Sequence, residues 1–422
     1  MIAEILSTRE EIRSGATVDT NSAYIAQKLE QAGMDVVRHT CVGDDMAALV
    51  SVLQEIGRRA QTAVVTGGLG PTVDDLTAAA AARAAGVELV LNPGALDAVR
   101  SYFSSRQRTM SRSNEKQAFF PAGAEPLMNP IGTAPGFCCQ IDGCRFFFLP
   151  GVPAEMRRML SEIVLPRLEI IQGKDKAYAL SRTITTFGLT ESATGERLAG
   201  YEAMFPGVKL GFRVKFPEIH VKLYMRGQDE RSLAATLQTA TDWVTTQLGE
   251  KVLCVDGSSI EKVVGRLLKQ QGATLAVAES CTGGLISDWL TNVPGSSDYF
   301  LFSGVTYSND AKTKILAVSP DTLKQYGAVS EETVKEMAAS VRRIAGATYG
   351  LATSGIAGPD GGTAEKPVGT VCIGLATPDA LTGQRYYFPF GHRLRNKEVF
   401  AASALDVLRR ALMKSFLDRY VF

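Results

Sequence analysis

Ser280 is the residue whose type and position most directly suggest chemistry. It closes the apolar run TLAVAES and precedes CTGGLISDWL, which has the pattern of a helix. A serine at a strand-to-helix junction can expose its hydroxyl, and amides of the following turn can stabilise an oxyanion. A serine that only caps a helix is common at the same position. Ser280 taken alone therefore leaves both interpretations open.

The segment GVTYSNDAK offers partners for this serine. Tyr307 stands at the end of a second expected strand, and Lys312 lies about one helical turn further on. A lysine whose pKa is lowered by burial can deprotonate a serine, and a tyrosine hydroxyl can position or relay the proton. Such an arrangement needs no imidazole, which suits a chain with 3 histidines. A strand-edge aromatic and a solvated charge are the alternative reading of the two residues.

Two glycine-rich loops could receive phosphate groups. The first, in AVVTGGLGPTVDDLT, follows a buried strand and opens a helix, where free amides attract anions and the carboxylates could hold a divalent ion. The second, TSGIAGPDGGTAEKPVG, is longer than an ordinary connection and could receive a phosphate or a ribose. A capped helix and a long turn are the respective alternatives. The candidate residues are Gly67, Gly68, Gly70, Thr72, Asp74 and Asp75 in the first loop and Ser354, Gly355 and Gly358 in the second.

The elements that must position these residues alternate between strands and helices, which predicts an α/β fold. Residues 1–165 predict a mostly parallel sheet covered on both faces, and residues 258–422 predict a second α/β domain. Residues 166–257 have the pattern of a small β-α-β-β-α module. The most regular helical patterns cover residues 21–32, 46–59, 230–248 and 260–271.

The composition is that of a globular chain without a dominating charge. Of the 422 residues 45% are hydrophobic, and 45 basic residues stand against 44 acidic ones. This balance gives no field that would gather nucleic acid or anionic lipid. No signal peptide or membrane-spanning run is expected, and the 7 cysteines show neither a paired framework nor zinc spacing. We therefore expect a cytoplasmic protein with small-molecule ligands.

Five motifs follow one another over about residues 258–420: AESCTGG, GVTYSNDAK, GAVSEE, SGIAGPDGG and KPVGTV. They resemble the C-terminal domain of the CinA family, a nicotinamide mononucleotide deamidase. The resemblance implies that Ser280 is the nucleophile, with Tyr307 and Lys312 as its partners, and that the reaction needs no metal. In GHRLRNK, His392 replaces an acid of the relatives. The implied substrate contacts are Thr282, Gly283, Ser297, Ser354, Gly355, Gly358 and Arg393.

The first domain carries VDTNS, VGDD, TGGLGPTVDDLT, NPIGTAPGF and LPGVPAEM. These motifs resemble the N-terminal domain of the CinA family, which is related to molybdopterin-binding domains and associated with a divalent-metal-dependent ADP-ribose pyrophosphatase. The resemblance implies a nucleotide site that includes Glu11, with Asp44 and Asp75 as candidate metal ligands. The chain departs from its relatives at Thr8-Arg9-Glu10-Glu11, where they have Gly-Thr-Glu. Arg9 could either block a phosphate there or pair with it.

The middle module resembles the KH-like linking domain of the same family. It lacks a GXXG loop with flanking basic residues, so we do not expect it to bind nucleic acid. We expect it to join the two α/β domains and to support a homodimer. Two other functions stay open at this point: an ADP-ribose pyrophosphatase without deamidase activity, and a non-catalytic nucleotide-binding protein associated with competence.

Overall fold

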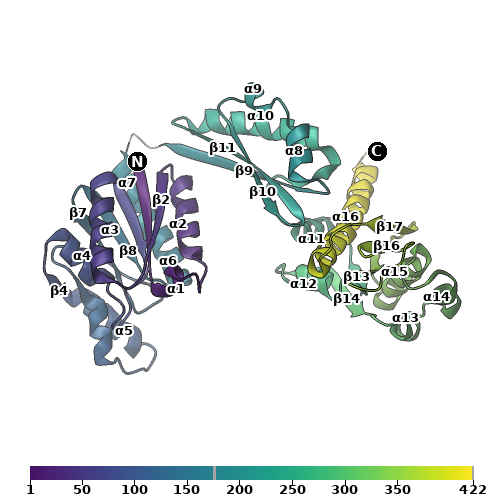
Figure 1. The fold of residues 1–422 in the computed structure, drawn as a ribbon, viewed down its shortest axis with the longest axis horizontal. Coiled ribbons are helices and arrows are strands. Elements are labelled where there is room, and N and C mark those ends of the chain that lie inside the picture. The colour runs from purple at the N-terminus through teal and green to yellow at the C-terminus, as the bar shows by residue number, and fades with distance from the viewer. Residues whose placement is uncertain (174–176, 421–422) are drawn as a thin grey trace. The chain divides into compact units, whose positions relative to one another are not determined.

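The computed structural model describes residues 1–173 and 177–420, the last five of these by their backbone alone. It divides into two compact units, whose elements are labelled in Figure 1. The first unit contains residues 1–180 and 225–235, and the second contains residues 181–224 and 236–422.

The first unit contains a six-stranded sheet in the order β2-β1-β3-β8-β7-β6. Its first four strands run parallel, whereas β7 and β6 are added antiparallel at one edge. The sheet strands are β1 (Ile2–Thr8), β2 (Asp35–Val42), β3 (Thr62–Thr66), β6 (Glu125–Leu127), β7 (Gly136–Ile141) and β8 (Cys144–Leu149), and a separate pair is formed by β4 (Leu89–Leu91) and β5 (Phe119–Pro121). The helices are α1 (Glu10–Arg13), α2 (Thr20–Gln31), α3 (Met46–Arg59), α4 (Thr77–Ala85), α5 (Pro93–Ser104), η1 (Arg112–Ala118), α6 (Pro153–Met159), η2 (Leu160–Val164) and α7 (Leu165–Gln172).

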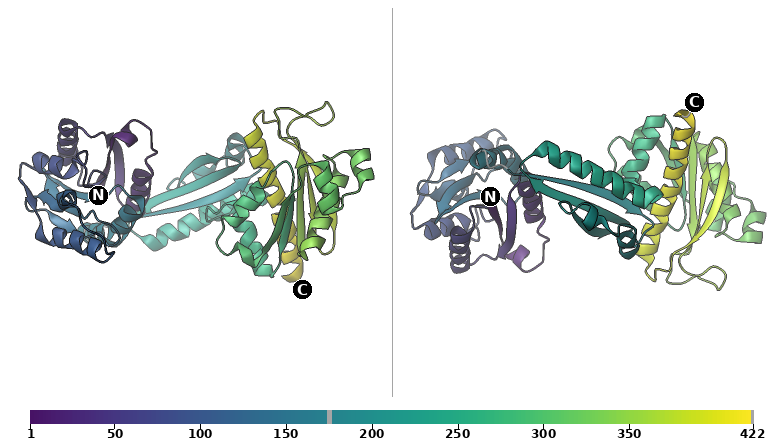
Figure 2. Two further views of the ribbon diagram at one scale, coloured as in Figure 1. Left: turned by 90° about the horizontal axis from the view of Figure 1, so that it is seen from below. Right: turned by 90° about the horizontal axis from the view of Figure 1, so that it is seen from above.

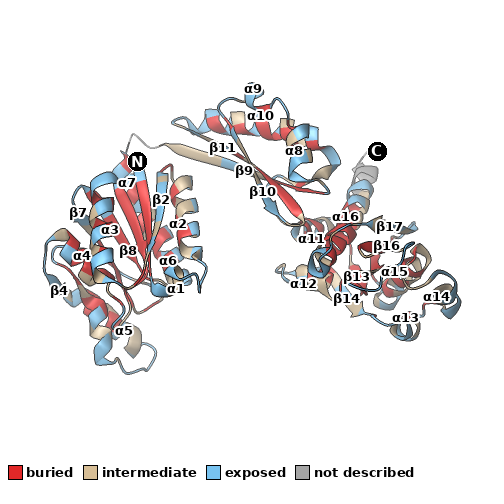
Figure 3. Cartoon of the chain, in the orientation of Figure 1, coloured by how far each residue is buried: buried red, intermediate tan, exposed pale blue. Residues whose placement is uncertain are grey.

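Helices cover both faces of this sheet, as its strand pattern predicts. On one face α2 and α6 bury Ile25 and Met156, and on the other α3 and α4 bury Leu53 and Ala81. Strand β3 is buried along its whole length because it lies in the middle of the sheet, and β8 beside it is almost entirely buried as well (Figure 3).

The middle module contains the expected β-α-β-β-α order, with a second short helix after the first and a short strand at the end that were not expected, and its sheet has the order β10-β11-β9-β12. Tyr201 of its short second helix and Phe205, which follows that helix, pack on Trp243 of the long one. Its elements are β9 (Tyr178–Phe187), α8 (Glu191–Arg197), α9 (Tyr201–Met204), β10 (Lys209–Lys215), β11 (Glu218–Gly227), α10 (Glu230–Leu248), η4 (Gly249–Lys251) and β12 (Val252–Cys254).

The C-terminal domain has a five-stranded sheet in the order β14-β13-β15-β16-β17. Strands β14, β13 and β15 run parallel, and β16 and β17 are antiparallel additions. Its elements are α11 (Ile260–Gln271), β13 (Leu275–Glu279), α12 (Leu285–Thr291), η5 (Ser296–Asp298), β14 (Phe300–Val305), α13 (Asn309–Leu316), α14 (Pro320–Tyr326), α15 (Glu331–Ala345), β15 (Tyr349–Gly355), β16 (Thr370–Ala376), β17 (Leu381–Tyr387) and α16 (Arg393–Tyr420).

The two faces of this second sheet are also covered by helices, so its strands are apolar on both sides. Leu275 and Val277 of β13 face α11, α12 and α16, whereas Ala276 and Ala278 of the same strand face α15. Figure 2 shows α16 and α15 on opposite sides of the sheet. Since β13, β14 and β15 are parallel, their carboxyl ends meet at one edge, where an α/β sheet usually binds its ligand.

The other whole-chain expectations concern thiols and membranes. All seven cysteines are unpaired, and Cys138, Cys144, Cys281 and Cys372 are buried. In the part of the chain that the structure describes, no helix combines the length and the apolarity needed to cross a bilayer.

Candidate active site

Ser280 lies at the carboxyl end of β13, where the chain turns sharply into α12. Strand β13 is fully buried, and Ser280 itself is 7% exposed. The helix begins at Leu285 rather than directly after Ser280, which corrects the sequence-based expectation. The physical reason is that Gly283 and Gly284 adopt left-handed φ angles of +61° and +93°, which end one backbone direction and start another. The residues 281–284 therefore form a turn beside the serine hydroxyl, in which the Gly283 amide donates to the Ser280 carbonyl and the Gly284 amide donates to Glu279, whereas the amides of Cys281 and Thr282 have no backbone acceptor among the described residues.

Lys312 of α13 reaches this serine from the neighbouring strand end. Its Nζ lies 3.0 Å from the Ser280 Oγ, 2.8 Å from the Thr306 carbonyl oxygen and 3.2 Å from the Tyr307 carbonyl oxygen. The lysine is 1% exposed, and this burial lowers its pKa from the ordinary value of 10.5. Burial disfavours the ammonium form because a charge loses its hydration there.

Three oxygen atoms surround the Lys312 amine. An ammonium donates to all three, whereas a neutral amine donates to the two carbonyls and leaves one lone pair that can accept the Ser280 hydroxyl proton. Helix α13 holds the lysine in place because Ser308 caps its first turn by accepting from the Ala311 amide. The sequence prediction that Ser280 and Lys312 come together is thus met in the geometry.

Tyr307 contributes to this centre through its backbone rather than its phenol. Its carbonyl accepts from Lys312, whereas its side chain is 59% exposed and its hydroxyl accepts from Arg393 Nη2 at 3.0 Å. The other guanidinium nitrogen, Nη1, donates to the Gly358 carbonyl at 2.6 Å. The expected proton relay through the phenol therefore has no direct path to Ser280, and the phenol instead fixes Arg393 at the mouth of the site.

Glu279 organises the turn and was not among the residues predicted from sequence. Its fully buried carboxylate accepts from the amides of Gly284, Ile286 and Ser287 at 2.9, 3.2 and 3.0 Å. It also accepts from the Ser287 hydroxyl at 2.6 Å. A carboxylate with four donors is a strong anchor because charge-assisted hydrogen bonds are the stronger kind. The signal in the sequence was a lone acid at the end of an otherwise apolar strand.

The remaining predicted hydroxyls, those of Thr282, Ser354 and Ser297, have different surroundings. The Thr282 hydroxyl lies 2.8 Å from that of Thr353 at the end of β15, which was not predicted. Ser354 is buried but donates to the Ala328 carbonyl at 2.7 Å, away from the centre, and Ser297 is exposed in η5 without a hydrogen bond to Ser280.

The glycine positions mark where basic side chains approach. A Cβ added to Gly283 would lie 3.4 Å from the Lys397 Nζ, so this amine borders the turn next to Ser280. Gly358 contributes its carbonyl to Arg393, and Gly355 is packed against β16. Arg393 and Lys397 are one turn apart on α16, which brings two positive charges to the same edge of the sheet.

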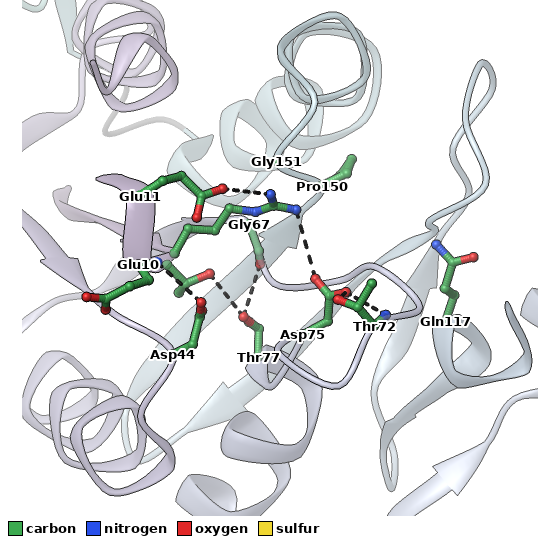
Figure 4. A network of polar contacts seen from close by, with 12 residues as sticks. Glu10, Glu11, Asp44, Gly67, Thr72, Asp75, Thr77, Gln117, Pro150 and Gly151 are labelled. Atoms are coloured by element: carbon green, nitrogen blue, oxygen red, sulfur yellow. Dashed lines mark hydrogen bonds and ion pairs between the residues drawn. The ribbon is translucent and has the colours of Figure 1, made fainter. Parts of the chain in front are cut away.

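The predicted site of the N-terminal domain lies after β3 (Figure 4). Asp75 is buried, and its Oδ2 accepts from the amide and the hydroxyl of Thr72 at 2.8 and 2.6 Å. The Thr77 hydroxyl donates to the Gly67 carbonyl at 3.0 Å. A Cβ added to Gly70 would lie 2.5 Å from the Asp75 carboxylate, so this glycine is needed for the close approach. Gly68 and the exposed Asp74 belong to the same turn.

Arg9 fills the space between the acidic residues of this site. Its Nη1 donates to Glu11 at 2.9 Å, and its Nη2 lies 4.0 Å from the Asp75 Oδ1. Asp44 accepts from the Glu10 amide at 3.3 Å, and burial, followed by the nearby charges of Glu11 and Asp74, raises its pKa. Arg9 and Glu11 also line a cavity of about 320 Å³ together with Asn21, Thr66, Gly67 and Gly151.

A divalent metal does not fit this arrangement. Within residues 1–173 and 177–420, no three His, Cys, Asp or Glu side chains come close enough together to hold a metal ion. One oxygen of Asp75 is already taken by Thr72, and the guanidinium of Arg9 supplies the positive charge between Glu11 and Asp75. We therefore derive no step through a metal in this domain.

Three family models match consecutive parts of the chain. Residues 4–170 match the probable molybdopterin binding domain, residues 181–253 match the KH domain of the damage-inducible protein CinA, and residues 257–412 match the CinA C-terminal domain. The fold and the matches together define a protein that joins a molybdopterin-binding-like domain to a CinA domain through a KH module.

Relatives along the whole length identify the family. A CinA-like protein of Desulfosudis oleivorans is 57% identical over 413 residues, covering 98% of this chain and 100% of its own, and one of Geobacter metallireducens is 44% identical with the same coverage. This chain belongs to the CinA family. Among solved structures, the competence/damage inducible protein CihA from Agrobacterium tumefaciens is 37% identical and covers 36% of this chain and 95% of its own, with a TM-score of 0.35.

Replacing Lys312 by methionine tests the burial of the amine through stability. Because the pKa of Lys312 is lowered in the folded chain, the folded state binds fewer protons there than the unfolded state between that lowered pKa and 10.5. The free energy of unfolding of the wild type should therefore rise as pH increases through that window and fall as pH decreases through it. We expect Lys312→Met to be more stable than wild type at pH 7 and to lose this advantage by about pH 10 in urea titrations.

Lys314→Met is the matched control, since Lys314 is on the same helix but has a 73% exposed side chain. Its stability difference from wild type should not vary in this way. Parallel pH curves for Lys312→Met and wild type would contradict the assignment of a lowered pKa.

Replacing Arg9 by alanine tests the built-in cation of the N-terminal domain. Its loss leaves Glu11 and Asp75 without their shared positive charge, and a divalent ion can then compensate them. We expect Mn²⁺ to raise the melting temperature of Arg9→Ala but not that of wild type. Arg13→Ala, which removes a neighbouring cation paired with Glu10 instead, should behave as wild type. An equal Mn²⁺ effect on all three proteins would refute this interpretation.

Proposed function

We propose that the C-terminal domain is an amidohydrolase that converts nicotinamide mononucleotide to nicotinate mononucleotide and ammonia. The observation that carries the proposal is the 3.0 Å contact between the buried Lys312 amine and the Ser280 hydroxyl. A serine beside a desolvated amine is one arrangement that can activate a hydroxyl without histidine. The CinA C-terminal match to residues 257–412 agrees with such an activity.

The first half of the reaction forms an ester between enzyme and substrate. The Lys312 amine takes the Ser280 proton as the serine oxygen bonds to the carboxamide carbon, whose carbonyl oxygen becomes an oxyanion. We assign the oxyanion contact to the amides of Cys281 and Thr282, because those of Gly283 and Gly284 already donate within the turn. The oxyanion then reforms the carbonyl, the C–N bond breaks, and Lys312 returns its proton to the departing nitrogen, so that ammonia leaves.

The second half returns the serine. Lys312 takes a proton from a water molecule, whose oxygen attacks the ester carbon, and the bond to the Ser280 oxygen breaks as that oxygen regains the proton. The product is nicotinate mononucleotide. Neither half needs a metal, because charge develops only on the substrate oxygen and on Lys312.

The substrate phosphate has cationic partners at the same edge of the sheet. Arg393 uses two of its five donors on Tyr307 and Gly358, and the others remain for an anion. Lys397 borders the turn on the same side of α16. We assign the 5′-phosphate to these two residues, with the loop after β15 closing on the ribose.

The proposal also covers the location, the oligomeric state and the ligands of the enzyme. We place it in the cytoplasm as a homodimer whose ligands are nucleotides, without nucleic-acid or membrane partners. ADP-ribose hydrolysis by the N-terminal domain is the rival activity. The Arg9 arrangement argues against a metal-dependent form of it, since the carboxylates already have their counter-charge.

Three variants test the deamidase directly. Ser280→Ala and Lys312→Met should each lower ammonia release from nicotinamide mononucleotide at least about a thousandfold, because nucleophile and base act as a unit. Lys314→Met should release ammonia at the wild-type rate. All three should retain the wild-type circular dichroism spectrum, and chelator should not slow the reaction. Near-normal turnover by Ser280→Ala would eliminate this mechanism, and metal-dependent AMP formation from ADP-ribose would favour the rival.

The pH dependence of turnover follows from the state of Lys312. The free enzyme is active when this amine is neutral, so kcat/KM should rise with pH up to the lowered pKa of Lys312 and level off above it. Initial rates from pH 6 to pH 10 measure this limb. A rate that is constant or falls across the whole range would contradict a lysine base.

A further inference from the structure

The tip of the β10–β11 hairpin in the middle module lies against the start of α16. The Phe216 ring meets the Phe390 ring edge-on with centroids 5.2 Å apart, and the Arg395 guanidinium lies 5.4 Å from the centre of the Phe216 ring. Phe216 is half-buried and packs on the core of the C-terminal domain. Figure 1 shows this end of β10 beside α11.

A buried carboxylate next to this tip links the hairpin to the C-terminal domain by a hydrogen bond. Glu218, the first residue of β11, accepts from the Ile260 amide at 3.0 Å and so caps α11 of the C-terminal domain. Its other oxygen lies 3.3 Å from the His220 Nε2. Glu218 is 4% exposed, so the attachment is shielded from water. The hairpin tip is therefore a fixed surface against which the segment 390–396 rests.

The same segment carries the groups that complete the candidate active site. The fully buried Asn396 donates to the carbonyl of Phe390 at 2.8 Å and to that of Ala357 at 3.0 Å. Residue 357 precedes Gly358, whose carbonyl accepts from Arg393. Arg393 in turn donates to Tyr307, whose carbonyl accepts from Lys312. A continuous set of contacts thus leads from Phe216 to the arginine assigned to the phosphate.

We propose that Phe216 is a positioning residue of the C-terminal site: by packing on Phe390 and Arg395 it holds the segment 390–396 so that Arg393 meets the substrate phosphate. This inference rests on the proposed function. It makes the middle module a part of the active-site architecture rather than a spacer. Since Phe216 touches neither Ser280 nor Lys312, its removal should weaken substrate binding and leave the acyl-transfer chemistry intact.

Kinetics of the full-length chain with two substrates test the proposal. We expect Phe216→Ala to raise KM for nicotinamide mononucleotide by roughly tenfold, with kcat within about threefold of wild type, because a displaced binding group costs affinity. The corresponding nucleoside lacks the 5′-phosphate that Arg393 holds. With this nucleoside, kcat/KM of Phe216→Ala should therefore stay within about twofold of the wild-type value. Phe216→Tyr keeps the ring and should restore the wild-type KM.

Tyr224→Ala provides the matched control, since it removes an aromatic ring from the same hairpin. Tyr224 stands on β11 and, among the described residues, has no ring contact with the C-terminal domain. It should leave both substrates unaffected. An unchanged KM in Phe216→Ala, or an equal loss for both substrates, would overturn the proposal.

Amide hydrogen exchange separates this inference from the proposed function. Residues 390–397 should exchange faster in Phe216→Ala than in wild type and in Tyr224→Ala, whether or not the protein turns over nicotinamide mononucleotide. Absence of ammonia release by the wild-type protein would contradict the proposed deamidase activity. Unchanged exchange of residues 390–397 in Phe216→Ala would contradict the positioning role of Phe216, even if the enzyme is active.

Discussion

The C-terminal domain depends on one constraint, which is the burial of an amine without a carboxylate partner. No acidic side chain among the described residues forms an ion pair with Lys312, whose polar neighbours are one hydroxyl and two carbonyls. Burying a charge in such surroundings is costly, so the pKa of Lys312 is lowered. The adjacent carboxyl ends of the parallel strands β13 and β14 bring Ser280 and the Thr306 carbonyl to the same amine. When the amine is deprotonated, its lone pair lies beside the Ser280 hydroxyl.

In the N-terminal domain, by contrast, charged side chains are paired with one another. Acidic residues gather after β1, β2 and β3, and the chain provides Arg9 as their counter-charge instead of leaving the position to a bound ion. The two α/β domains therefore share a sheet architecture but not an electrostatic design. One buries an amine without an acidic partner, and the other pairs its carboxylates with an arginine. The KH module contacts the C-terminal domain through Glu218 and Phe216.

Much of this organisation could be predicted from local sequence. The helices over 46–59, 230–248 and 260–271 begin and end at the expected residues, because an apolar periodicity of 3.6 is a strong signal. The pairing of Ser280 with Lys312 could be anticipated from motif order. The direction of the Tyr307 phenol and the role of Glu279 could not, because both depend on which amide or guanidinium comes near after folding. The antiparallel direction of β6, β7, β16 and β17 could not be predicted either, because no local sequence pattern indicates it.

The central claim is that burial lowers the pKa of Lys312 where it meets Ser280, and a titration of that one side chain tests it most directly. Lysine residues labelled with ¹³C at Cε can be followed by NMR in the full-length protein, with Lys312→Met to assign the signal. The structure predicts an apparent pKa below the ordinary 10.5 that returns toward it on unfolding. A Lys312 signal that titrates at or above the ordinary value in the folded protein would contradict the account.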